Sequence, residues 1–415
     1  MRTVLFTGKG GVGKTTAAAA TGVLLAARGR KALVVSTDPA HSLADALGVP
    51  LGPTPTEVEP GLAGMQVDAL RRFEAGWDGL RDRLGGLLGG AGMAGLDGLA
   101  AAELPMPPGI ADVCALLEVR DQVAHGPWDA VLVDCAPTAE TLRLLALPEA
   151  LAGYLERVWP VHRRVVGSLR PVLGRLAGEP VLPPEPVLAA AGRLQADLAA
   201  VRALLTAPGL ASVRLVLTPE AVVVAETRRM LTALALHGYA VDSLIANRVF
   251  PPEAAESPWG TAWRSAQDAA LNGIVESVPG LAVRRATYRT VEPVGIAALL
   301  EVAGELYGTD DPLGPAPAVP AMRVTREGPD FVLRVALPLV RRSDVRLVRS
   351  GEDLVITVGE QRRRVALPSV LRRCLPVGAA AGDGAVRVRF RPDPELWPRG
   401  LAAPGGIAAG PGPAP

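Results

Sequence analysis

The fold of this chain is decided by one stretch near its N-terminus, Gly8-Lys9-Gly10-Gly11-Val12-Gly13-Lys14-Thr15. The stretch satisfies the pattern G-x-x-x-x-G-K-[S/T] of a phosphate-binding loop, or P-loop. It follows a β-branched, apolar run at residues 3–7 and precedes an Ala- and Leu-rich run at residues 15–28, which is typical of a helix that ends at Gly29. A glycine-rich turn between a buried strand and a helix surrounds an anion with backbone N–H groups, so the motif predicts a nucleotide-phosphate site.

The polar residues of the loop have expected roles in binding ATP and Mg²⁺. Lys14 would reach the β- and γ-phosphates, and the hydroxyl group of Thr15 would bind Mg²⁺. The loop backbone would hold the phosphate groups. The expected nucleotide-binding residues of the loop are Gly8, Lys9, Gly10, Gly11, Val12, Gly13, Lys14, Thr15 and Thr16.

Two aspartates follow apolar runs further along the chain. Asp38 comes after the run at residues 32–36, and Asp134 ends the run at residues 130–133. Carboxylates at the carboxyl ends of parallel strands meet at the nucleotide crevice. There Asp38 could orient the attacking water and Asp134 could hold Mg²⁺ through water. A helix N-cap is the alternative for either aspartate alone, but two of them after a P-loop favour the functional interpretation.

The remaining pattern predicts an α/β fold with a doubly wound parallel sheet. Further strands are expected at residues 212–217 and 243–246. Residues 70–110 and 151–205 are helical or Gly- and Pro-rich and do not fit the sheet, so we expect a helical subdomain there. The predicted ATPase domain spans residues 1–307.

The hydrophobic period changes after residue 320. Residues 308–320 are rich in Asp, Pro and Gly and are expected to form a linker. Apolar residues then alternate with other residues at Phe331, Leu333 and Val335 and in two later runs, which predicts a small all-β sandwich over residues 321–392. The Pro-, Gly- and Ala-rich residues 393–415 predict a disordered tail.

Composition excludes several classes of protein. A formal net charge of +1 and 4% aromatic residues argue against nucleic-acid binding. The three cysteines, at positions 114, 135 and 374, do not form a CxxC motif. This argues against a zinc site and against a disulfide framework. The N-terminus lacks a signal-peptide layout, and the apolar run at residues 17–27 is too short to span a bilayer. We therefore expect a cytoplasmic protein without stable membrane insertion.

Two further segments carry a specific resemblance. The stretches STDPAHSLADALG (36–48) and DCAPTAETLRLLALP (134–148) resemble the two switch segments of the arsenite-pump ATPases and of their relatives that deliver tail-anchored membrane proteins. The resemblance covers roughly residues 1–305. It implies that Asp38 positions the catalytic water, that Asp134 belongs to the second switch, and that Asn247 contacts the adenine edge.

The resemblance also implies two copies of the chain. Lys9, a second lysine inside the loop, marks the deviant form of the motif, in which this lysine reaches the partner's nucleotide. The implied catalytic residues are therefore Asp38, Lys9 and Lys14, in a homodimer. Two departures stand out: Ala139-Glu140 replaces the usual Gly-His, and the zinc-binding CxxC of the eukaryotic dimers is absent.

The C-terminal segment resembles the α-crystallin domain of small heat-shock proteins. The resemblance rests on the runs at residues 330–338, 351–359 and 384–390. Such a domain could bind a client or an edge strand, pack against the ATPase, or support dimerisation.

The expected function is an ATP-driven switch that holds and releases a client. Possible partners are a hydrophobic membrane-protein client and a membrane pump subunit. Two alternatives stay open, namely the ATPase subunit of an arsenite or antimonite efflux pump and a non-catalytic chaperone or scaffold stabilised by nucleotide. A metalloid site would need about three converging thiolates, and the three cysteines lie far apart in the sequence.

Overall fold

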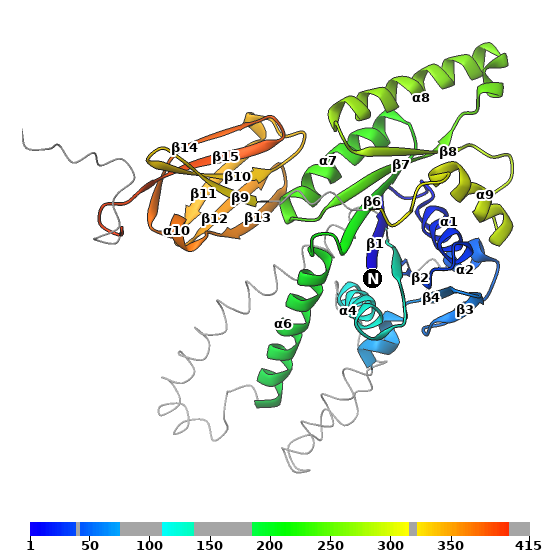
Figure 1. Cartoon of the computed structure of the whole chain (residues 1–415), viewed down its shortest axis with the longest axis horizontal. Coiled ribbons are helices and arrows are strands. Elements are labelled where there is room, and N and C mark those ends of the chain that lie inside the picture. Colours follow the sequence, from blue (N-terminus) through cyan, green and yellow to red (C-terminus); the bar gives the residue numbers. More distant parts are fainter. Residues whose placement is uncertain (39–41, 75–109, 137–184, 315–321, 398–415) are drawn as a thin grey trace, which may run out of the picture.

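The computed structural model describes residues 1–38, 42–74, 110–136, 185–314 and 322–397 (Figure 1). Its larger part is built on a sheet of eight strands in the order β3-β4-β2-β5-β1-β6-β7-β8. All neighbouring strands in it pair in parallel except β3 and β4, which are antiparallel. The strands are β1 (Arg2–Thr7), β2 (Ala32–Ser36), β3 (Thr56–Glu59), β4 (Leu62–Gln66), β5 (Ala130–Asp134), β6 (Ala211–Leu217), β7 (Val241–Val249) and β8 (Ala282–Thr287).

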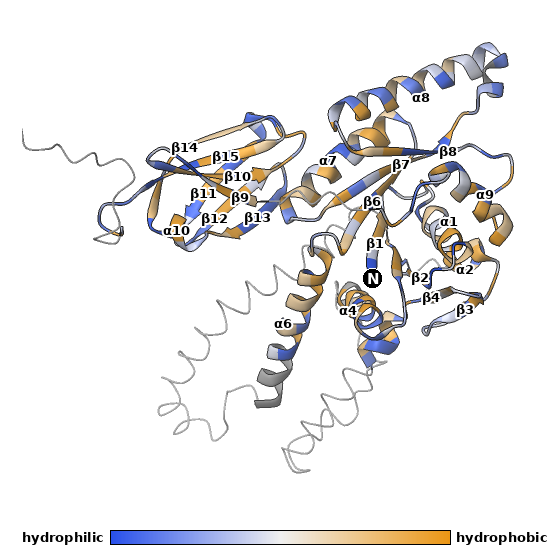
Figure 2. Ribbon diagram, in the orientation of Figure 1, coloured by the Kyte–Doolittle hydropathy of each residue, from blue (hydrophilic) through white to orange (hydrophobic). Residues whose placement is uncertain are grey.

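The α/β fold expected from the sequence is confirmed, including all five predicted strands. Three strands were not expected, namely β3, β4 and β8. The central strands β2, β5 and β6 are buried along their whole length. Burial on both faces is why β2 and β5 appear as apolar runs, whereas β6 also contains the buried Arg214. β8 is an edge strand and contains two arginines, so it lacks that run (Figure 2). β3 is a short edge strand with two glutamates.

Helices connect the strands in the alternation that parallel pairing requires. In Figure 1, α1, α2 and α9 lie on the right of the sheet, and α4 and α6 lie at its lower left. Gly29 follows α1 with φ 76°, which confirms the expected helix end. The helices are α1 (Lys14–Ala27), α2 (Ser42–Leu47), α4 (Ile110–His125), α6 (Glu185–Leu205), α7 (Ala221–His237), the 3₁₀ turn η2 (Pro252–Glu256), α8 (Pro258–Ser277) and α9 (Ile296–Tyr307).

Much of the expected helical subdomain lies outside the described residues. These undescribed parts are residues 75–109 and 151–184. Within the described part, α6 confirms helix at the end of the second stretch. Across the described ranges, none of the helices is both long enough and apolar enough to cross a bilayer.

The C-terminal part is an all-antiparallel sandwich, as predicted. One sheet has the order β14-β15-β10-β9, and the other has the order β11-β12-β13. Leu333, Ile356 and Phe390 are fully buried between them. The strands are β9 (Met322–Glu327), β10 (Asp330–Ala336), β11 (Val345–Ser350), β12 (Asp353–Val358), β13 (Gln361–Ala366), β14 (Cys374–Gly382) and β15 (Ala385–Pro392), with the short helical turns η3 (Arg342–Asp344) and α10 (Ser369–Arg372) between them.

The sandwich contacts the end of α7. Leu236 of α7 is fully buried in the hydrophobic cluster of the sandwich. The hydroxyl of Thr232 donates to the carbonyl of Pro338 at 2.8 Å, and the guanidinium of Arg363 donates to the carbonyl of Leu236. Apolar burial and two hydrogen bonds therefore attach the sandwich to a helix of the larger domain.

Residues 308–314, the first part of the expected linker, are bound to the larger domain. Arg28 donates to the carbonyl of Gly308 at 2.7 Å, and Arg214 donates to the carbonyl of Pro312. Leu313 is 9% exposed and packs in the core of that domain. Residues 315–320 lie outside the described ranges.

A buried arginine on β6 connects this strand to β7 and α9 and, through Tyr307, to α1. Arg214 of β6 is 3% exposed, and its guanidinium donates to Asp242 at 3.1 Å and to the hydroxyl of Tyr307 at 2.8 Å. The same Tyr307 hydroxyl bonds Thr21 of α1 at 2.7 Å. Burial opposes the charge of Arg214, but the neighbouring Tyr307 and Asp242 outweigh burial and hold the pKa of Arg214 above its ordinary value.

We expect Arg214→Met to lower the free energy of unfolding by about 3–5 kcal/mol, because it leaves the Asp242 carboxylate without its main buried partner. Urea denaturation of the purified protein measures the change. Arg30→Met is the matched control, since the Arg30–Asp311 pair is 49% and 52% exposed and its loss should cost under about 1 kcal/mol. Equal effects of the two variants would contradict a stabilising role for the buried network.

Candidate nucleotide site

The phosphate loop lies between β1 and α1 and packs closely against two other strands. Gly8 has φ 155°, and a Cβ atom there would lie 2.0 Å from the carbonyl oxygen of Val216 in β6. Gly13 has φ 91°, and a Cβ atom there would lie 2.2 Å from Nδ2 of Asn247 in β7. Only glycine fits both positions, so the loop keeps its curvature and presents backbone N–H groups at the carboxyl edge of the sheet.

The loop contains two lysines, Lys9 and Lys14. Lys14 is the first residue of α1 and is 6% exposed, and its ammonium donates to the carbonyl of Lys9 at a long 3.4 Å. A buried ammonium with one long hydrogen bond is available for a stronger acceptor such as a phosphate oxygen. The side chain of Lys9 is half-buried.

Asp134 at the end of β5 is the polar centre of the site. Its Oδ2 atom accepts a hydrogen bond from the Thr15 hydroxyl at 2.8 Å and lies 3.5 Å from the Ser36 hydroxyl. The Thr15 hydroxyl also lies 3.1 Å from the hydroxyl of Ser42 in α2. Thr15 and Asp134, predicted separately, are therefore in direct contact, and they join the loop to the segments after β2 and β5.

The buried surroundings of Asp134 disfavour its charged form. Burial raises the pKa of its carboxyl group to about 7, against the lowering effects of the Thr15 hydrogen bond and the nearby Lys14, while Asp38 raises the pKa further. Its second oxygen, Oδ1, is buried and has no hydrogen-bond partner. A buried oxygen without a partner beside a threonine hydroxyl fits Mg²⁺ or a water bound to it.

The described residues contain no group of three or more His, Cys, Asp and Glu side chains that could hold a metal ion by themselves. Mg²⁺ commonly uses one or two protein ligands together with phosphate oxygens and water. Thr15 and Asp134 match that limited contribution.

Asp38 follows β2 at the same edge of the sheet. The side chain of Gln66 in β4 donates to the Asp38 carbonyl at 2.7 Å, and the N–H of Thr37 donates to the Asp134 carbonyl at 2.9 Å. The Asp38 carboxylate is close enough to Asp134 to influence its titration. Residues 39–41 lie outside the described ranges, as do Ala139 and Glu140 of the second switch segment.

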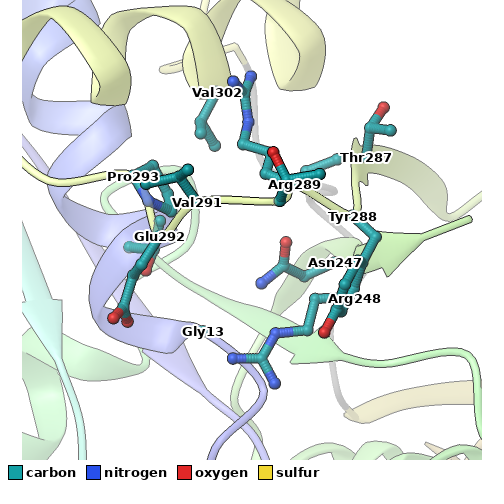
Figure 3. A pocket seen from close by; sticks show the side chains of 13 residues that line it. Gly13, Asn247, Arg248, Thr287, Tyr288, Arg289, Val291, Glu292, Pro293 and Val302 are labelled. Carbon is teal, nitrogen blue, oxygen red and sulfur yellow. The ribbon is translucent and has the colours of Figure 1, made fainter. Parts of the chain in front are cut away.

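A cavity of about 330 Å³ opens beside the first turn of α1 (Figure 3). Asn247 lines it, as does Thr16, and the Asn247 amide donates to the carbonyl of Val12 at 2.9 Å. In Figure 3 the side chains of Asn247, Arg248 and Glu292 lie around the space next to Gly13. A cavity next to the phosphate loop is the expected place for the nucleoside part of a nucleotide.

Sequence reasoning missed most of this cavity wall. Arg248 contributes to it, and so does the segment at residues 287–293 between β8 and α9. The signal that could have located this segment is the strand β8 itself, because the loop after a parallel strand lies at the carboxyl edge of the sheet. Because β8 was not predicted, the polar run after residue 286 could not be assigned to the edge of the sheet that carries the nucleotide site.

The parallel sheet, the loop between β1 and α1, and the aspartate at the end of β5 together define a P-loop nucleotide-binding protein. The chain matches the family of anion-transporting ATPases over residues 1–308 and belongs to that family. Residues 328–390 match the HSP20-like domain found in ArsA proteins, the arsenite-pump ATPases. Both resemblances noted in the sequence are confirmed.

Several relatives span almost the whole chain. An uncharacterized protein of Streptomyces coelicolor is 39% identical over 411 residues, covering 96% of this chain and 100% of the relative. A protein of Chlorobaculum tepidum with the provisional name of an arsenical pump-driving ATPase is 32% identical over 393 residues, covering 94% and 96%. The ATPase GET3 of Podospora anserina is 30% identical over 289 residues, covering 66% of this chain and 81% of the relative.

The raised pKa of Asp134 generates a prediction about stability without nucleotide or Mg²⁺. Because folding favours the protonated carboxyl group, the free energy of unfolding falls as the pH rises from 3.8 toward about 7. Asp134→Asn removes this charge and keeps an oxygen that can accept from Thr15. We expect the variant to be more stable than the wild type at pH 8, by on the order of 2–4 kcal/mol, and similar to it at pH 4.

Urea denaturation at both pH values measures this difference. Asp45→Asn, at an exposed position in α2, is the control and should keep the wild-type dependence on pH. An Asp134→Asn variant with the same change in stability between pH 4 and pH 8 as the wild type would contradict the assignment.

Proposed function

We propose that this chain is an ATP-hydrolysing switch that works as a homodimer and holds or releases a client according to its nucleotide state. The observation that carries the proposal is the contact of Thr15 with both Asp134 and Ser42. It joins the phosphate loop to the two segments that follow β2 and β5. Any ligand that draws the Thr15 hydroxyl away therefore changes the bonding of both segments.

The chain's own residues would bind and orient ATP. The loop N–H groups and Lys14 would hold the phosphate groups, and Asn247 with the cavity wall would hold the nucleoside. Thr15 and, through water, Asp134 would hold Mg²⁺, which when bound neutralises charge on the phosphate groups. Asp38 would position the attacking water, and the Lys9 ammonium would reach the nucleotide of the second copy.

The switch would act through two segments. In the described structure, Asp134 Oδ2 is occupied by Thr15 and Oδ1 has no partner. Thr15 is the residue that would hold Mg²⁺, and its hydrogen bonds to Asp134 and Ser42 are the contacts through which nucleotide binding would be linked to the segments after β2 and β5. A change in the contacts of segments next to the phosphate groups is a known way in which hydrolysis is converted into a conformational change.

Three buried cysteines favour a protein client over a metalloid. Cys114, Cys135 and Cys374 are all buried, and burial raises the pKa of each thiol. Metalloid binding would require thiolates that converge, whereas Cys374 belongs to the sandwich. We therefore favour a client with an exposed hydrophobic segment. The name of the Chlorobaculum relative supports the second candidate, an ATPase subunit of an arsenical pump.

Asp38→Asn tests hydrolysis. We expect kcat for ATP to fall by about 10²- to 10⁴-fold with the Kd for ATP changed only a few-fold, because the carboxylate would orient water and not the nucleotide. Lys14→Ala should lose ATP binding itself. Steady-state phosphate release and isothermal titration calorimetry provide both values. Normal turnover in Asp38→Asn would sink the proposed catalytic role.

Affinity capture tests the client. Asp38→Asn held in ATP should co-purify with proteins that contain a single hydrophobic helix, as identified by mass spectrometry, and Lys14→Ala should not. Recovery of the chain alone, together with ATP turnover that rises on addition of antimonite, would contradict the protein client and support a metalloid ligand.

A further inference from the structure

A row of three arginines crosses the outer face of the four-stranded sheet of the sandwich. Arg334 of β10 lies directly opposite Arg323 of β9 on one side and Arg387 of β15 on the other. Residues directly opposite one another in antiparallel strands point to the same face, with Cβ atoms about 5 Å apart. Arg389 lies two positions further along β15 and so belongs to that face too. We call Arg323, Arg334, Arg387 and Arg389 the basic face.

The basic face points to solvent. Leu333, Val386 and Val388 on the same strands are buried in the core of the sandwich, and side chains alternate between the two faces along a strand. All four arginines are exposed. The sandwich meets the larger domain at the end of α7 (Figure 1), through Leu236 and the carbonyl of Pro338. Attachment to the larger domain therefore leaves the basic face exposed.

Acidic side chains neutralise little of this charge. Arg387 pairs with Asp383 at 3.7 Å, but the two side chains are 50% and 88% exposed, and such a pair is weak. Asp330 accepts a hydrogen bond from Arg391 at 2.9 Å. This bond, with a smaller effect of Arg389, holds the pKa of Asp330 below its ordinary value. Among the described residues, the other three arginines of the basic face form no ion pair.

The arrangement of these charges has a cost. Like charges directly opposite one another destabilise a sheet, and here three of them lie in one row. The excess is also specific to the sandwich, because residues 322–397 contain 15 arginines and nine acidic residues, whereas the whole chain has a net charge of only +1. An anionic ligand would offset the repulsion within the row.

An exposed apolar edge borders the basic face. The neighbouring strand β14 contains no charged residue. Its Leu375 lies opposite Arg391, on the same face as the arginines, and is 50% exposed. Val377 of the same strand is 45% exposed. Basic residues beside exposed apolar side chains are typical of surfaces that bind anionic lipid head groups and enter the boundary of the acyl chains.

Other polyanions fit this surface less well. The aromatic residues within 322–397 are Phe331, Phe390 and Trp397, and all three pack in the core of the sandwich. Single-stranded nucleic acid is held on exposed rings on which its bases stack, and the basic face has none. A double helix is read by an element that enters its groove, whereas the basic face is one side of a sheet. An acidic protein segment would use the arginines without the apolar edge.

We propose that the basic face docks the chain on the surface of an anionic lipid bilayer. The arginines would bind the phosphate groups of the lipids, and Leu375 and Val377 would enter the boundary between head groups and acyl chains. The inference goes beyond the ATP switch, because it gives the sandwich a binding surface of its own that does not involve the nucleotide site.

The double variant Arg334→Gln/Arg387→Gln tests the proposal. Co-sedimentation of the full chain, without nucleotide and at low ionic strength, with vesicles of equal parts phosphatidylcholine and phosphatidylglycerol measures the partition coefficient. We expect the variant to bind about 25-fold more weakly than the wild type, because each basic residue at an anionic surface contributes a factor of about five. Binding of the wild type should fall as salt is added, and vesicles of phosphatidylcholine alone should not bind it.

A second double variant, Arg346→Gln/Arg362→Gln, is the matched control. Arg346 and Arg362 are exposed and lie on either side of Thr357 in the other sheet, so the variant loses the same charge from the opposite face. It should bind vesicles almost as the wild type does. Arg334→Lys/Arg387→Lys keeps the charge and should retain most of the binding. In urea, Arg334→Gln/Arg387→Gln should be at least as stable as the wild type, because it removes like charges.

The outcomes distinguish a lipid surface from other ligands. Equal vesicle binding by the wild type and Arg334→Gln/Arg387→Gln would overturn the proposal, and so would an equal loss in both Gln double variants. A wild type that binds an RNA oligonucleotide or poly-glutamate through these arginines, but not the vesicles, would also overturn it. If the Gln variant does not fold, Arg389→Gln replaces it, with an expected loss of about five-fold. Absence of ATP turnover in the wild type would contradict the proposed switch and leave this inference standing.

Discussion

The hydrogen bond between the Thr15 hydroxyl and the buried Asp134 carboxylate is the interaction on which the site depends. It brings the start of α1 to the end of β5 and includes Ser42 of α2 through the same hydroxyl. The bond does not satisfy the carboxylate completely, since Oδ1 has no partner and the pKa is raised to about 7. A buried acceptor without a partner is unfavourable unless a ligand supplies one, and this is the basis for the proposal that Asp134 helps to hold Mg²⁺.

The buried network around Arg214 of β6 shows the opposite arrangement. There Arg214 has multiple buried partners, among them Asp242 and Tyr307. This satisfied network fixes α1, α9 and the segment at residues 308–314 to the sheet. The domain therefore contains one buried network whose charges are paired and one site whose buried carboxylate is only partly bonded. Such a division allows the loops of the nucleotide edge to rearrange while the core and the attachment of the sandwich stay unchanged.

Prediction from the sequence succeeded where one residue type has one physical use. The glycines and Lys14 of the loop, and the aspartates that end apolar runs, were located because parallel strands bring their carboxyl ends to one edge. It failed at β8, whose two arginines break the apolar run. Because β8 was not predicted, the cavity wall at residues 287–293 was not predicted either. The stacking of Phe250 on Tyr288 was missed because the two residues are 38 positions apart and no local period connects them.

The α/β fold, the phosphate loop and the all-β sandwich could be predicted from the sequence, because each follows from local periods and turn chemistry. Three contacts could not be predicted in this way, namely Thr15 with Asp134, Leu236 of α7 with the core of the sandwich, and Gln267 with both Arg248 and Phe250. These contacts join residues far apart in the chain. Which of them form depends on how the strands are ordered and how the helices pack, and a one-dimensional pattern does not contain that order.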